Sequence, residues 1–174
     1  GESEPVFPVG KLIIANNRLN YQDGDIQLRI PRMNVDHPVL NGVDANVLAR
    51  GIGLFDQAKL PHADQNGNVS IAGHLDIYGM EFAGIVNMQP GDPIYLYFEG
   101  NRYTYEVCEI FIVDEYDWSP IKVRDYACVS LQSCVSGQPS LRQFVVGRLV
   151  KVKPVESQAE SCPFYTSDAA DEGG

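Results

Sequence analysis

Short segments that alternate apolar and polar side chains run along most of the chain, and turn-forming residues separate them. In residues 26–30, aliphatic side chains at every second position alternate with Gln27 and Arg29 before Pro31, which is the pattern of a half-buried β-strand. Strands of this kind and spacing predict an antiparallel barrel or sandwich. Comparable runs occupy residues 37–43, 67–74, 126–134 and 142–152.

Two other segments predict a hairpin and a helix. Residues 92–115 contain two longer strand-like runs around the Glu-Gly-Asn sequence at 99–101, which is typical of a β-hairpin. Residues 44–52 are the best helix candidate, because Asp44 can cap the first turn and Gly51 can end the last one. We expect little other helix, so the fold class is all-β with one or two short helices.

The length of the chain indicates a single domain. Its 174 residues suffice for one buried core and are short for two. We expect an N-terminal tail at residues 1–10, one β-rich domain at residues 11–155 and an acidic C-terminal tail at residues 156–174.

Composition and charge exclude several classes of partner. The chain is 44% hydrophobic and 21% charged, as in ordinary globular proteins, and its net charge of −10 argues against binding nucleic acid or an anionic membrane surface. No apolar run approaches the ~18 residues of a membrane-spanning helix. Because the chain begins with Gly1 and not with Met, we expect a trimmed or processed form whose native membrane anchor has been removed.

Cysteine and histidine spacing gives no sign of a metal centre. There is no C-x-x-C pair, and the three histidines show no ligand spacing, so we expect no zinc and no organic cofactor. A core of this size needs no disulfide framework, and we interpret Cys108 and Cys128 as core residues. The four cysteines are Cys108, Cys128, Cys134 and Cys162.

One loop leaves two interpretations open. Residues 114–118 hold three carboxylates, which favours a solvated acidic loop over the alternative of a calcium site. Trp118, at the end of this loop, could line a substrate groove or pack beneath the loop.

Three reactive side chains stand at the ends of predicted strands. His74 follows the run at 67–74, Cys134 ends the run at 126–134, and Arg142 begins the next run. A thiol becomes a nucleophile when an imidazole takes its proton. An arginine can then stabilise the oxyanion that forms on an attacked carbonyl. Together the three residues predict acyl transfer.

The sequence around these residues resembles the sortases, the cysteine transpeptidases of the Gram-positive cell surface. Residues 67–76, GNVSIAGHLD, look like the family's strand leading to its histidine. Residues 130–134, SLQSC, are similar to the signature Thr-Leu-x-Thr-Cys, with serine in place of both threonines. Residues 142–150, RQFVVGRLV, resemble the strand that begins with the family's arginine. The resemblance covers roughly residues 26–152.

The resemblance implies a closed antiparallel sortase-type β-barrel and a role for each residue. His74, Cys134 and Arg142 would be catalytic, and Ser133 and Trp118 would contact the substrate. Arg148 lies on the same face of its strand as Arg142 but about 20 Å further along, too far from the thiol.

The resemblance also implies the substrates and the location. The substrate would be an LPXTG-like sorting signal of a surface protein or pilin, cleaved after Thr, and the acceptor an amine of a cell-wall precursor or a pilin. The enzyme would act at the extracellular face of the membrane. Two alternatives stay open: a hydrolytic cysteine protease, and an inactive sortase-like binding module.

Overall fold

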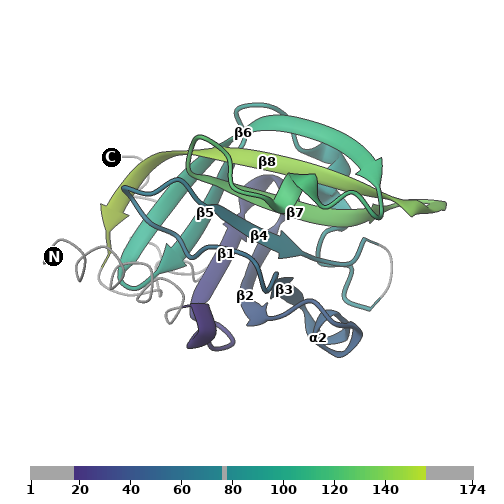
Figure 1. The fold of residues 1–174 in the computed structure, drawn as a ribbon, viewed down its shortest axis with the longest axis horizontal. Coiled ribbons are helices and arrows are strands. Elements are labelled where there is room, and N and C mark those ends of the chain that lie inside the picture. Colours follow the sequence, from purple (N-terminus) through teal and green to yellow (C-terminus); the bar gives the residue numbers. More distant parts are fainter. Residues whose placement is uncertain (1–17, 76–77, 156–174) are drawn as a thin grey trace, which may run out of the picture.

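The computed structural model describes residues 18–75 and 78–155, and eight of its strands form a closed barrel (Figure 1). Around the barrel the strands follow the order β1-β2-β3-β4-β7-β8-β6-β5. The predicted all-β barrel is therefore confirmed, whereas the two predicted tails at 1–10 and 156–174 lie outside the described residues. The strands are β1 (Ile26–Ile30), β2 (Val35–Asn41), β3 (Ile52–Leu54), β4 (Asn68–Ala72), β5 (Pro93–Phe98), β6 (Asn101–Asp114), β7 (Cys128–Val135) and β8 (Gln138–Pro154).

The predicted helix is confirmed as α2 (Ala45–Arg50), which lies beside β3 in Figure 1. The Asp44 carboxylate accepts a hydrogen bond from the Val47 amide at 3.0 Å, which satisfies one of the free N–H groups of the first turn. The described residues also include three short 3₁₀ helices: η1 (Pro31–Met33), η2 (Ala83–Asn87) and η3 (Ser119–Ile121). Within the described ranges, no helix has the length and apolar character needed to cross a membrane.

The predicted hairpin is confirmed as β5 and β6, which pair antiparallel up to Phe98 and Asn101. Only Glu99 and Gly100 connect the strands, and their φ angles are +49° and +80°. Positive φ at both positions is characteristic of the type I′ turn, whose twist matches that of the flanking strands. Glycine adopts this conformation without steric cost, which explains the glycine at position 100.

Two pairs of neighbouring strands are parallel, which differs from the antiparallel pairing expected throughout. β2 pairs parallel with β3, and β4 pairs parallel with β7. Parallel neighbours need a crossover connection. The α2 helix supplies it for the first pair. For the second pair, the connection consists of the segment with η2, the β5–β6 hairpin and residues 115–127. We call residues 115–127 the crossover segment.

The strands β4, β7 and β8 bury alternate side chains in the core. Val69, Ile71, Val129, Leu131 and Val145 belong to one cluster of buried apolar residues, and each is at most 2% exposed. Because successive side chains of a strand point to opposite faces, the residues between them lie on the other face of the sheet. The crossover segment covers part of that face.

Polar contacts attach the crossover segment to the sheet. The Asn68 amide donates to the carbonyl oxygens of Pro120 and Lys122 at 2.8 and 2.9 Å. Nη1 of Arg124 donates to the Pro120 carbonyl at 3.0 Å and to the Ser130 hydroxyl at 3.2 Å. Asn68 and Ser130 are almost fully buried, and the bond from Asn68 to Pro120 is buried, so it is shielded from water.

The interpretation of Cys108 as a core residue is wrong. The register between β6 and β8 shifts between Val107 and Glu109, which indicates a β-bulge at this position. Just before the bulge, β6 alternates regularly: Tyr105 and Val107 are buried, whereas Glu106 and Cys108 are exposed, so Cys108 lies on the outer face of the strand. Cys128 is fully buried, as predicted.

We expect Asn68→Ala to lower the free energy of unfolding by about 1–3 kcal/mol, because it removes the buried amide that donates to the Pro120 and Lys122 carbonyl groups, although Pro120 keeps its bond from Arg124. Chemical denaturation followed by circular dichroism measures this loss. The matched control is Asn66→Ala, since Asn66 is exposed and precedes the strand. Equal stabilities of the two variants would contradict this account of the crossover contacts.

Candidate active site

The register of β7 and β8 places Cys134 directly opposite Arg142. Directly opposed residues of an antiparallel pair project from the same face, with Cβ atoms about 4.5–5.5 Å apart. By the alternation along β7, Cys134 lies on the face that carries Ser130 and the crossover segment, and its side chain is partly exposed. The two residues separated by a small polar loop in the sequence are therefore neighbours in the sheet.

The parallel pairing of β4 with β7 brings His74 to the same rim. Ala72 lies opposite Gln132, and the ladder continues past the end of β4, because the Gly73 amide donates to the Gln132 carbonyl at 3.0 Å. The constant offset of this pairing carries His74 to the level of Cys134. The structure thus gathers the three predicted catalytic residues from three adjacent strands.

The residue before His74 must be glycine for steric reasons. A Cβ atom at Gly73 would lie 2.9 Å from the ring of Phe82, closer than real Cβ atoms approach, and 3.0 Å from Ile52, which is also a tight contact. Phe82 is fully buried, and its amide donates to the His74 carbonyl at 2.9 Å. The close contact fixes the backbone on both sides of the imidazole.

Tyr78 contacts the imidazole, and sequence reasoning did not find it. The two rings have centroids 5.2 Å apart with an angle of 41° between their planes. Tyr78 and Met80 both have φ near +50°, a left-handed conformation that is uncommon for residues other than glycine. Such backbone conformations persist where surrounding contacts hold them and often occur at functional sites.

The Arg142 guanidinium is held by the first residues of β8 and lies near the crossover segment. Nη1 donates to the carbonyl oxygens of Pro139 and Leu141 at 2.7 and 2.8 Å. Nη2 lies 3.6 Å from the Glu115 carboxylate. Glu115 belongs to the acidic loop that the sequence analysis interprets as solvated, with a calcium site as the alternative.

The two predicted substrate contacts have different environments. Ser133 is 2% exposed, and its hydroxyl donates to the Cys134 carbonyl at 2.9 Å. Ser133 lies on the opposite face of β7 from the Cys134 thiol, which does not favour a direct contact with substrate. The contact stays a prediction. Trp118 packs edge-on against Phe55, with centroids 6.4 Å apart, and is half exposed, so it both packs and presents a surface.

Arg148 is remote from the thiol. It lies opposite Cys128 at the far end of β7, and its guanidinium lies 3.8 Å from the centre of the Tyr126 ring. This cation–π contact gives Arg148 a role on the sheet surface.

The carboxylates of the acidic loop face different partners. An Asp114 oxygen accepts from the Tyr116 amide at 2.9 Å, and an Asp117 oxygen accepts from the Ser119 amide at 2.9 Å. Glu115 faces Arg142. Across residues 18–75 and 78–155, no three acidic, cysteine or histidine side chains are grouped so that they could hold a metal ion.

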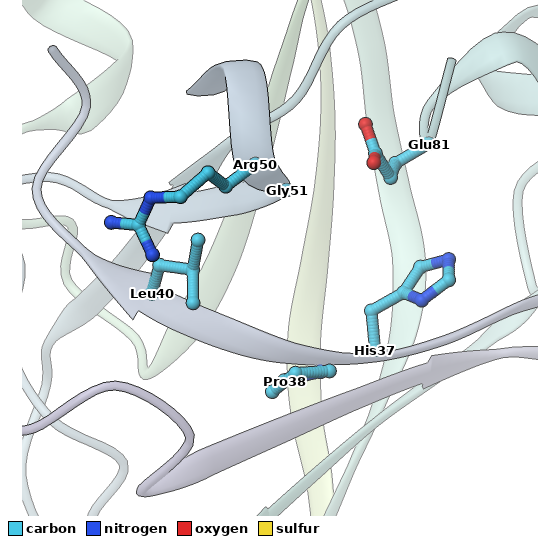
Figure 2. A pocket seen from close by; sticks show the side chains of 6 residues that line it. All are labelled: His37, Pro38, Leu40, Arg50, Gly51 and Glu81. Atoms are coloured by element: carbon cyan, nitrogen blue, oxygen red, sulfur yellow. The ribbon is translucent and has the colours of Figure 1, made fainter. Parts of the chain in front are cut away.

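A hollow of about 70 Å³ lies elsewhere, between β2, the end of α2 and the segment after His74 (Figure 2). Figure 2 shows the Arg50 and Glu81 side chains reaching it from different segments, with His37 beside Glu81. None of the three predicted catalytic residues lines it.

The register of the adjacent strands thus places a thiol, an imidazole and a guanidinium at one rim of the barrel, and these three groups are suited to acyl transfer. A family model of the sortase domain matches residues 28–150, which is most of the chain. The chain belongs to the sortase family. The three motifs of the resemblance lie within the matched residues; the first contains β4, and the other two lie on β7 and β8.

The chain is also similar in sequence and in structure to individual sortases. The chain is 32% identical to sortase D of Bacillus subtilis (strain 168) over 97 residues and 28% identical to sortase A of Bacillus anthracis over 142 residues. These matches cover 56% and 80% of this chain, but only 46% and 66% of the relatives' own length. The crystal structure of sortase C-1 from Actinomyces oris is 25% identical, with a TM-score of 0.69 over 72% of this chain and 71% of that one.

We expect iodoacetamide to alkylate Cys134 and Cys108 in the native sortase and to leave Cys128 unmodified. Burial raises the pKa of the Cys128 thiol, and Arg124 offsets this only in part, so little of the reactive thiolate is present near neutral pH. Peptide-resolved mass spectrometry measures each cysteine separately, including Cys162 outside the described residues. Denaturant should expose Cys128, and alkylation of native Cys128 as fast as Cys108 would contradict its placement.

Proposed function

We propose that this sortase is a cysteine transpeptidase that cleaves an LPXTG-like sorting signal after Thr and transfers the new acyl group to an amine. The observation that supports this proposal is the register pairing of Cys134 with Arg142, beside the strand that leads to His74. The substrate motif comes from the family resemblance, and this chain's residues supply the chemistry.

In the first half of the reaction, the Cys134 thiolate attacks the carbonyl carbon of the threonine. The carbonyl electrons move to the oxygen, and the Arg142 guanidinium stabilises this oxyanion. When the oxyanion collapses, the peptide C–N bond breaks and the leaving amine takes a proton from the imidazolium of His74. A thioester between threonine and Cys134 remains.

In the second half, an amine of a cell-wall precursor or of a pilin attacks the thioester. Neutral His74 accepts the proton of the attacking amine, and the oxyanion again forms beside Arg142. Its collapse breaks the C–S bond and restores the thiolate and the imidazolium. Bond making and bond breaking balance without a metal or an organic cofactor.

The acceptor distinguishes transfer from hydrolysis, the first alternative. The protein should be incubated with a fluorogenic LPXTG peptide, with and without an amine such as triglycine, and the products identified by mass spectrometry. A transpeptidase forms the amide product when the amine is present, whereas a hydrolytic protease yields the free acid in both cases. An inactive binding module forms neither product and no thioacyl adduct at Cys134.

The proposed location is the extracellular face of a Gram-positive membrane, to which a native anchor beyond residues 1–174 would attach the enzyme. The proposed partners are surface proteins or pilins that carry the sorting signal. The net charge of −10 argues against nucleic acid as a further partner.

We expect Cys134→Ala to abolish transpeptidation while the fold is retained, because a partly exposed thiol at the rim contributes little packing. Turnover of the fluorogenic peptide measures the activity, and circular dichroism measures the fold. Cys108→Ala is the matched control, since Cys108 is an exposed thiol of β6. Residual transfer by the Cys134 variant at the native rate would refute the assignment of the nucleophile.

We expect Arg142→Ala to lower kcat/KM by about 10²–10³, as the loss of an oxyanion donor typically does. Arg142→Lys should recover only part of this loss, because an ammonium cannot reproduce the planar fork of a guanidinium. Arg148→Ala is the control and should retain activity, since Arg148 contacts Tyr126 at the far end of the strand pair. A greater loss in the Arg148 variant would show that the wrong arginine has been assigned.

A further inference from the structure

We propose that Glu115 is a positioning residue for the reaction, and that it orients the Arg142 guanidinium toward the substrate oxyanion. This inference rests on the proposed role of Arg142. Glu115 begins the crossover segment, just after β6 ends at Asp114, and its carboxylate lies 3.6 Å from Nη2 of Arg142.

The hydrogen bonds of Arg142 indicate which edge of the guanidinium is left for substrate. A guanidinium has five N–H groups in fixed directions. The two hydrogens of Nη1 match the carbonyl oxygens of Pro139 and Leu141, at 2.7 and 2.8 Å. The carboxylate of Glu115 stands near Nη2. One hydrogen of Nη2 and the hydrogen of Nε then form the edge that can receive an oxyanion.

A backbone hydrogen bond and the register of β6 with β8 fix the position of Glu115. The Glu115 amide donates to the Ser140 carbonyl at 2.8 Å. The backbone of the crossover segment is therefore attached to the same part of β8 that binds Nη1 of Arg142. In the register of β6 and β8, Asp114 lies opposite Leu141 and Val113 opposite Arg142. Glu115 thus follows directly from the strand that flanks Arg142 on the side away from Cys134.

The Arg142–Glu115 pair is partly buried. The Arg142 side chain is 23% exposed and the Glu115 side chain 29%. A fully exposed pair of this kind has little effect on stability, because solvent and salt screen it. At partial burial, the carboxylate can still restrict the direction of the guanidinium without neutralising its ability to donate. We therefore expect Glu115 to affect the rate of the reaction more than the stability of the fold.

The effect should appear in kcat. The guanidinium interacts with the oxyanion, which exists only after attack by Cys134, so a misdirected Arg142 weakens transition-state binding and leaves the binding of the ground-state peptide unchanged. A small displacement of a catalytic group can cost up to about 10²-fold in rate.

The test compares Glu115→Gln with the wild type in the fluorogenic LPXTG assay with triglycine. Glutamine keeps the length and the shape of the side chain and removes its charge. We expect kcat to fall by about 10-fold to 100-fold with KM unchanged and the melting temperature retained. Glu106→Gln is the matched control, because Glu106 is an exposed carboxylate of β6 that lies opposite Arg148.

The same substitution in an Arg142→Ala background shows whether Glu115 acts through Arg142. We expect no further loss there, because coupled residues are not additive. An equal loss in both backgrounds, or an unchanged or higher kcat in Glu115→Gln alone, would overturn the positioning role.

Failure of the underlying function has a different signature. If Arg142→Ala is as active as the wild type, or if the wild type forms no thioacyl adduct with the peptide, the proposed reaction is wrong, whatever Glu115→Gln does. If Arg142→Ala loses activity as expected and Glu115→Gln does not, only the inference on Glu115 fails.

Discussion

The parallel pairing of β4 with β7 is the constraint on which the rest of the site depends. These strands are distant in the chain, and the hydrogen-bond ladder between them fixes the level of His74 relative to Cys134. A slip of this ladder by one residue would turn every side chain of one strand to the other face. The buried apolar residues on the core side oppose such a slip, so core packing specifies the position of the imidazole.

The crossover segment that makes this parallel pairing possible also serves the site directly. Its middle is attached to the sheet through Asn68 and Arg124, and its first residue, Glu115, reaches the guanidinium of Arg142. The crossover segment, which the parallel pairing requires, thus also lies beside Arg142. Two strands and one connection, each needed for the fold, supply the surroundings of Arg142.

Local sequence patterns predicted most of the fold and the three reactive residues, because alternation, turn chemistry and caps act over a few residues. The β5–β6 hairpin and the α2 helix are examples in which every local signal agrees with the structure. Alternation shows which face a residue occupies but not which strand lies beside it, so the parallel pairs were not foreseen. The β-bulge in β6 leaves no mark in the sequence, and the role of Glu115 depends on a tertiary contact with Arg142.

The distribution of the site over β4, β7 and β8 has a consequence for the newly synthesised chain as it folds. β4 and β7 meet through contacts between residues far apart in the chain, and contacts of high sequence separation form slowly. An unfinished chain can carry the thiol, but it lacks the geometry that makes the thiol a catalyst. Reactivity therefore arises together with closure of the barrel, and a partly folded chain cannot cleave its neighbours by this chemistry.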